Sequence, residues 1–235
     1  MTETCRQYLH ITYNSSNTWG YPIWNAINAA TQKGRLRQLP DALRNEIGDL
    51  VLAVSVRLDY LPLIRDRING GVAPLYEEIR QRDKAKDKYA YEPKVNVKYA
   101  LLVDINSFLF EVYSGLAIAE TLGKKLLRQV LGKQKRGSLL RDVLQQWRKS
   151  AGWLDKLEEG RHHFTHSGTP WIAICLDQEP KHDLLIMKEN IHSFDDPTKF
   201  IRLSEFSNVL KGYIDLLMLL QQYLVHEVGQ AGKTL

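Results

Sequence analysis

The chain has 235 residues and a mass of 27.1 kDa, and its 32 Lys and Arg residues exceed its 27 Asp and Glu residues by five. An apolar fraction of 44% and a charged fraction of 25% are typical of a globular protein and exclude a disordered, a collagen-like or a disulfide-stapled chain. Cys5 and Cys175 are too few and too far apart for a disulfide framework or a four-ligand zinc site, which favours a reducing compartment.

We expect neither a secretory signal nor a membrane span. No N-terminal stretch combines basic residues with an apolar run. The most apolar late segment, residues 213–225, is too short to cross a bilayer and is interrupted by polar side chains such as Asp215. The sequence therefore predicts a cytoplasmic protein without a membrane partner.

The first 38 residues are aromatic and polar and are predicted to form an N-terminal segment separate from the main domain. Pro22 is suited to open a short helix over residues 22–30, and Gly34 to stop it. The aromatic residues of this segment, at positions 8–24, are more typical of a core than of a base-stacking surface. The main domain is expected to span residues 39–235.

A strong helical pattern follows Pro40, where apolar residues recur at three- and four-residue intervals up to Leu58. Pro62 is expected to kink or end this helix, and residues 69–71, Asn-Gly-Gly, to close the unit. A shorter helix is predicted over residues 74–82. Residues 83–94, rich in Lys and Asp, are predicted to form an exposed connection.

A second long helix is predicted from residue 95 to residue 122, with one wide buried face. Gly115 and Gly123 mark either a close helix crossing or a break. Two shorter helices are expected next, one from residues 137–138 through Trp147 and one from residue 153 to about residue 165. Gly168 and Pro170 must stop the latter.

The hydrophobic period changes after Pro170. Two apolar runs, residues 171–176 and 183–187, flank a polar stretch and predict a β-hairpin at about residues 171–188. A last helix is expected between residues 204 and 228, with five apolar side chains facing inward: Leu210, Ile214, Leu217, Met218 and Leu220. The predicted fold class is all-α, a helical bundle with one inserted β-hairpin.

The positive charge is concentrated in one segment. Residues 121–150 hold nine Lys and Arg residues against the single acid Asp142, a surplus of eight. A surface of one sign attracts phosphate backbones, so we expect RNA to bind here, although a solvated helix surface is an equally simple explanation. The predicted RNA-binding residues are Lys124, Lys125, Arg128, Lys133, Lys135, Arg136 and Arg141.

Three of the seven histidines lie within five residues, beside Arg161, where a helix is predicted to end. Arginine carries a permanent charge and a fork of donors that match a phosphate. A histidine such as His166 exchanges protons near neutral pH, which suits attack by a ribose 2′-hydroxyl and needs no metal. Five residues of regular helix place Arg161 and His166 about 140° apart. They converge only if the helix breaks near Thr165 or if a second subunit supplies part of the site.

An arginine, a polar residue of the Asn, Asp or His type, three further residues and a histidine, on a helix of an all-α bundle, resemble the motif of HEPN domains. Such domains occur in prokaryotic toxins, abortive-infection proteins and CRISPR-associated nucleases. Arg161 and His166 match the defining pair and His162 the polar second residue, and a hairpin before the last helix resembles one branch of the family. The resemblance implies a metal-independent endoribonuclease that acts as a homodimer, with the motif residues of both subunits lining one cleft.

The resemblance also implies a toxin or antiviral defence context, with an antitoxin or other regulatory protein as a possible partner. Some HEPN toxins have a tyrosine two residues after the histidine, but this chain has Gly168 there, so regulation through that tyrosine is not implied. We expect Arg161 to hold the scissile phosphate, His166 to act as general base or acid, and His162 to position either the phosphate or the other histidine. No cofactor is expected. The alternative function is a non-catalytic HEPN-like module for nucleotide or RNA binding, or for dimerisation.

Two further interpretations of the histidine segment remain open. Glu158, His162 and His166 have the spacing of metal ligands on one face of an unbroken helix, although no fourth ligand is apparent. Alternatively, Arg161 caps the helix or pairs with Glu158, and the histidines are ordinary surface residues. Three acids of the long second helix are candidates to orient a catalytic histidine, although ordinary helix charges are the simpler explanation: Asp104, Glu111 and Glu120.

Overall fold

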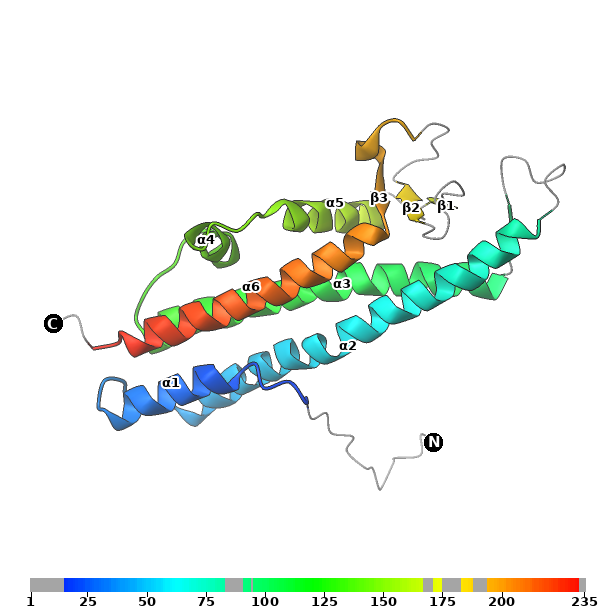
Figure 1. Ribbon diagram of the computed structural model, residues 1–235. Helices are drawn as coiled ribbons and strands as arrows, with labels where there is room; N and C mark the ends of the chain where they lie inside the picture. The colour runs from blue at the N-terminus through cyan, green and yellow to red at the C-terminus, as the bar shows by residue number, and fades with distance from the viewer. Residues whose placement is uncertain are drawn as a thin grey trace, which may run out of the picture.

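A computed structural model describes residues 15–82, 91–93, 95–166, 171–174, 183–187 and 194–232. In these ranges the helices are α1 (Tyr21–Gln32), α2 (Asp41–Arg80), α3 (Val95–Lys125) with a π-helical extension η1 (Leu126–Val130), α4 (Leu139–Gln146), α5 (Gly152–His166) and α6 (Ser204–Gly229). The strands are β1 (Trp171–Ile174), β2 (Leu184–Met187) and β3 (Phe200–Arg202), with a short 3₁₀ helix η2 (Pro197–Lys199) before β3 (Figure 1). The prediction of a mostly helical bundle is confirmed.

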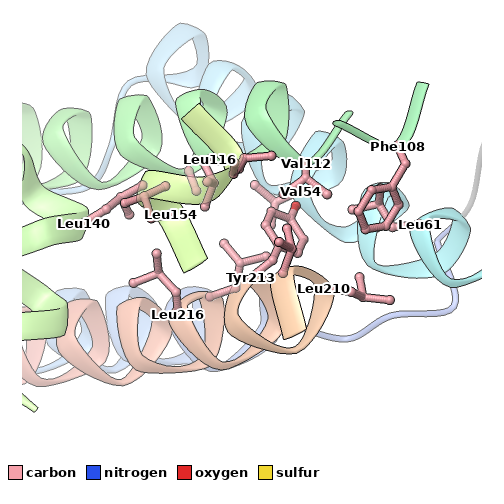
Figure 2. Packing of buried hydrophobic residues seen from close by; sticks show 14 of the residues in the cluster. Val54, Leu61, Phe108, Val112, Leu116, Leu140, Leu154, Leu210, Tyr213 and Leu216 are labelled. Carbon is pink, nitrogen blue, oxygen red and sulfur yellow. The ribbon is translucent and has the colours of Figure 1, made fainter. Parts of the chain in front are cut away.

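The helices form three layers, with α3 and α6 in the middle, α1 and α2 on one side, and α4 and α5 on the other (Figure 1). Figure 2 shows how these layers meet: Tyr213 of α6 points between Val54 of α2 and Val112 of α3. The rings of Phe108 and Phe206 stack with their centroids 5.0 Å apart. One continuous apolar core therefore joins all three layers.

Helix α2 corrects two of the sequence predictions. It continues through Pro62, through the Asn69–Gly71 turn signal and through Pro74, where the pattern predicted a kink or an end and a separate helix. The buried side chains keep the helical interval on both sides of these breakers, with Leu61, Ile64, Ile68 and Val72 facing the core. Burial of each such side chain contributes about 1.5–3 kcal/mol, so together they outweigh the cost of about 3 kcal/mol for an internal proline. Most of the predicted connection at residues 83–94 lies outside the described residues.

Helix α3 forms as predicted and extends a few residues further. Gly115 and Gly123 lie inside it, so they mark close crossings and not breaks. A Cβ atom at Gly115 would collide with the Tyr213 hydroxyl, and one at Gly123 would collide with Leu139. By length and composition, residues 96–130 could also cross a membrane. Helices in the middle of a bundle often have the same length and apolar composition, and this helix lies in the middle layer.

The predicted hairpin is confirmed, and the structure adds a third strand to it. Strand β1 pairs antiparallel with β2 in the register Trp171–Met187 to Ile174–Leu184. Strand β3 pairs with the other edge of β2, giving the order β1-β2-β3. Sequence periodicity missed β3 because it has only three residues, and its pairing with β2 defines it.

The described part of the N-terminal segment lies in the same core as the rest of the bundle. Helix α1 packs on α6, and its residues Ile23 and Ile27 are buried. The Trp19 indole is also buried and its Nε1 donates a hydrogen bond to the Leu217 carbonyl over 2.9 Å. The aromatic residue Trp19 is thus core, as the pattern favoured. On α6 the inward prediction is wrong for Met218, which is 43% exposed and lies beside the buried stripe.

Candidate functional site

Helix α5 carries the predicted catalytic residues, and four contacts fix it in the bundle. Leu154 and Leu157 bury its apolar side. Its start is capped by the Ser150 hydroxyl, which accepts a hydrogen bond from the Gly152 amide over 3.2 Å. Lys156 forms an ion pair with Glu205 at the beginning of α6, at 3.0 Å. These contacts direct the C-terminal end of α5 toward the sheet (Figure 1).

The backbone of α5 is helical from Gly152 through His166, so the helix does not break near Thr165. Five residues of continuous helix turn His166 about 140° away from Arg161. One of the two routes to a joint site is therefore absent from this chain, and convergence requires a second copy. The side chains of Arg161 and His166 lie outside the described residues. The His162 side chain is described, is exposed and has an interaction partner.

The same continuity keeps Glu158, His162 and His166 within about 40° of one helix face, as the metal interpretation requires. The Glu158 carboxylate, however, is engaged by the Arg141 guanidinium at 3.2 Å. In the part of the chain that the structure describes, no three side chains of ligand type come together as a metal site, and the His166 side chain is not in that part. The alternative interpretation pairs Glu158 with Arg161, but the pair that the structure describes for Glu158 is with Arg141.

The predicted RNA-binding segment is largely neutralised by acids from elsewhere in the fold. Five of its seven cations form ion pairs with six carboxylates, which are contributed by α2, α3, α4, α5 and α6. The pairs are Lys124 with Glu120, Lys125 with Glu46, Lys133 with Glu227, Lys135 with Asp142, and Arg141 with both Asp155 and Glu158. The hydrogen bonds that Arg141 donates to Asp155 and Lys135 donates to Asp142 raise the pKa of Arg141 and of Lys135.

Arg128 and Arg136 are the exceptions, because both are exposed and neither forms an ion pair with a described residue. Residues 121–150 hold nine cations, and the six paired carboxylates, Asp142 among them, reduce their surplus to three charges in this region of space. The surplus of eight that the sequence shows along the chain is therefore not the charge that an RNA strand would meet.

The three acids considered as partners of a catalytic histidine are each bound elsewhere. Asp104 pairs with Arg67 at 2.5 Å on the α2 side of α3. Glu120 accepts hydrogen bonds from the backbone amides of Leu139 and Leu140, at 2.8 and 3.0 Å, and so caps the beginning of α4. Among the described residues, neither acid pairs with a side chain of the motif helix.

Glu111 belongs to a half-buried polar cluster between α2, α3 and α6. Its carboxylate pairs with Arg57 at 3.2 Å and accepts a short hydrogen bond from the Tyr60 hydroxyl. Burial and this hydrogen bond raise the pKa of Tyr60, and burial raises that of Tyr213. The Tyr213 hydroxyl and the Arg57 Nε have no hydrogen-bond partner among the described residues. The cluster ties the long helices together, and its one sign in the sequence is an acid among apolar neighbours.

No protein-family model, curated protein or solved structure matches this chain. Its function must therefore be inferred from its own residues.

Proposed function

We propose that the chain is a metal-independent endoribonuclease of the HEPN type, with an active site completed by a second copy. The observation that carries this proposal is the place of the motif: Arg161, His162 and His166 lie in the last turns of α5, at the end of the bundle that meets the sheet. Helix ends expose side chains and backbone groups, and substrate reaches them easily.

Each motif residue has a role in cleavage by the ribose 2′-hydroxyl. His166 as general base takes the proton of that hydroxyl, and the oxygen attacks the adjacent phosphorus. Arg161 binds the phosphate and stabilises the added negative charge of the transition state. The bond to the 5′-oxygen breaks, and the proton that His166 has taken up returns through solvent to that oxygen, while His162 positions either the phosphate or the other histidine. The products are a 2′,3′-cyclic phosphate and a 5′-hydroxyl end.

The helix geometry supports a homodimer. Five residues of regular helix put positions 161 and 166 about 140° apart around the axis of α5, so two copies of α5 that face each other would bring both kinds of residue to one cleft. Each active site would then draw its arginine from one copy and its histidine from the other. RNA is the proposed substrate, and a toxin or defence role with a regulatory protein remains part of the same proposal.

The second candidate is a non-catalytic module that binds RNA or nucleotide. The ion pairs of the basic segment lower the attraction for a long RNA strand and so favour a nucleotide as the ligand of such a module. The second candidate is also favoured by the divergence of Arg161 and His166 within one chain.

Cleavage of single-stranded RNA by the purified full-length protein, in the presence of a chelator, separates the two candidates. We expect Arg161→Ala and His166→Ala each to lower the rate at least ~100-fold. The matched controls Arg80→Ala and His226→Ala change exposed residues outside the motif and should retain activity, and circular dichroism checks the fold of all four. Cleavage that survives both motif variants contradicts the proposal. Binding without cleavage supports the second candidate, and activity that requires zinc or manganese supports the metal interpretation.

Mixing the two inactive variants tests the shared site. If each site combines an arginine from one copy with a histidine from the other, a mixed dimer has one intact site. Random exchange makes half of the dimers mixed, so activity should return to about a quarter of the wild-type level. A mixture that exchanges subunits and remains inactive shows that both residues act within one chain.

The salt dependence of RNA binding tests the basic segment. Replacement of Arg128 and Arg136 by Gln should flatten the slope of log affinity against log salt, because these cations have no ion pair with a described residue. Replacement of Lys125, which is 15% exposed and paired with Glu46, should leave the slope unchanged. An equal change for the paired and the unpaired residues would show that the ion pairs do not control RNA binding.

A further inference from the structure

An open groove of about 540 Å³ lies at the end of the bundle opposite the motif. It is bounded by the loop between α1 and α2, the end of η1 and the end of α6. Its volume is within the range of small-molecule sites. Three cations line it, Arg35, Arg37 and Lys133, and none of its lining residues is acidic.

Two of these charges are uncompensated. Lys133 is paired with Glu227 at 2.6 Å, but Arg35 and Arg37 are exposed and form no ion pair with a described residue. Positive and negative ends of helix dipoles both meet the groove, because α1, η1 and α6 end there and α2 begins there. The side chains therefore decide the charge of the groove. Two arginine forks without a carboxylate are suited to phosphate oxygens.

A second hollow of about 220 Å³ adjoins the groove, because Gln38 and Leu39 line both. Its wall includes the partly buried indole of Trp24 and the side chains of Asn28 and Arg44. An indole face is a platform on which any nucleobase can stack, and an amide offers hydrogen bonds to base edges. A phosphate site and a base platform thus lie next to each other.

We propose that the groove and its adjoining hollow bind a phosphorylated nucleotide, with the phosphates on Arg35 and Arg37 and the base against Trp24. The ligand is either a free nucleotide or one unit of single-stranded RNA. This site is distinct from the motif, because α6 separates the two ends of the bundle (Figure 1). The 26 residues of α6 span about 39 Å at 1.5 Å per residue. The proposal therefore does not depend on RNA cleavage.

Isothermal titration of the full chain with adenosine triphosphate, inorganic phosphate and a twelve-nucleotide single-stranded RNA tests the proposal. Arg35→Gln together with Arg37→Gln should weaken binding of the triphosphate at least tenfold. The charge-matched control, Arg65→Gln with Arg80→Gln, removes two cations from the surface of α2 and should change binding less than twofold. Trp24→Leu keeps an apolar side chain and should weaken the triphosphate but not inorganic phosphate.

The outcomes are distinct. Equal binding by the wild type and the Arg35/Arg37 variant, equal loss in the control, or no binding of any probe at millimolar concentration overturns the proposal. If RNA does not displace the bound triphosphate, the ligand is a free nucleotide. If RNA competes with the triphosphate for the same arginines, the ligand is single-stranded RNA. Arg161→Ala should leave all of these affinities unchanged, so failure of the ribonuclease proposal and failure of this one are separable.

Discussion

Replacing Gly212 with alanine should loosen the contact between α6 and α5, the helix that carries the motif. A Cβ atom at Gly212 would lie 2.5 Å from two atoms of the Trp153 ring and 2.7 Å from a third. A rigid indole packed on the core cannot yield by a simple rotation, so the two helices must separate. Overpacking of this kind costs about 1–3 kcal/mol. Alanine regains about 1 kcal/mol of helix propensity, which leaves a net loss of about 0–2 kcal/mol in the free energy of unfolding.

Gly48→Ala is the matched control, because Gly48 lies inside α2 and nothing stands within 4 Å of its Cβ position. It should gain the propensity term alone and stabilise the protein by about 0.5–1 kcal/mol. The two variants should therefore differ by about 1–3 kcal/mol. With a urea slope of about 2–3 kcal/mol/M, the midpoint of unfolding of Gly212→Ala should lie about 0.3–1.5 M below that of Gly48→Ala.

The cause is checked by a double substitution. Trp153→Leu in the Gly212→Ala background removes the collision and should recover at least ~1 kcal/mol relative to the sum of the two single effects. If Gly212→Ala proves as stabilising as Gly48→Ala, or if no coupling with Trp153 is measured, the close contact between α5 and α6 is refuted.

Three further predictions concern the polar contacts. Glu120→Ala removes the cap of α4 and should cost about 1–2 kcal/mol by urea denaturation, whereas an equal loss in the exposed control Glu77→Ala would contradict the capping role. Hydrogen bonds led by the Ser15 hydroxyl lower the pKa of Asp59 from its ordinary 3.8, so this contact stabilises the folded state at neutral pH. The stabilisation is lost as pH falls below 3.8 through the folded pKa; amide exchange of residues 15–19, corrected for intrinsic rate, should then accelerate, and Asp59→Asn should show the same acceleration at pH 7. The pKa values of Tyr60 and Tyr213 are raised, chiefly by burial, so the folded state loses stability as pH rises above 10.0, and at least two of the 11 tyrosines should ionise only on unfolding when tyrosinate absorbance is followed.

Much of the secondary structure was predictable because local patterns control it. The apolar intervals of α3 and the hairpin runs were sufficient, and so were the start signals at Pro22 and Ser138, which begin α1 and α4 in the structure. The prediction failed where a local signal opposed tertiary packing. Pro62 and Pro74 oppose helix individually, but the buried stripe on both sides of them keeps α2 continuous.

The candidate site was predictable only in part. Composition and spacing identify Arg161, His162 and His166, and the structure adds that their helix is unbroken. Arg35 and Arg37 could not be predicted as a binding site, because two arginines in a loop form no motif. They become a candidate binding site only in the folded protein, where the end of η1 and the end of α6 form a groove around them.

Charge shows most clearly what each level decides. The sequence by itself determines the net charge of +5 and its concentration in residues 121–150, because both are sums along the chain. Only the tertiary structure determines what those charges face, since Coulomb interactions depend on distance in space and carboxylates from five helices are folded against the segment. Among the cations without an ion pair to a described residue, Arg35 and Arg37 lie in the groove and Arg128 and Arg136 on the surface, and those positions follow from the packing of the helices.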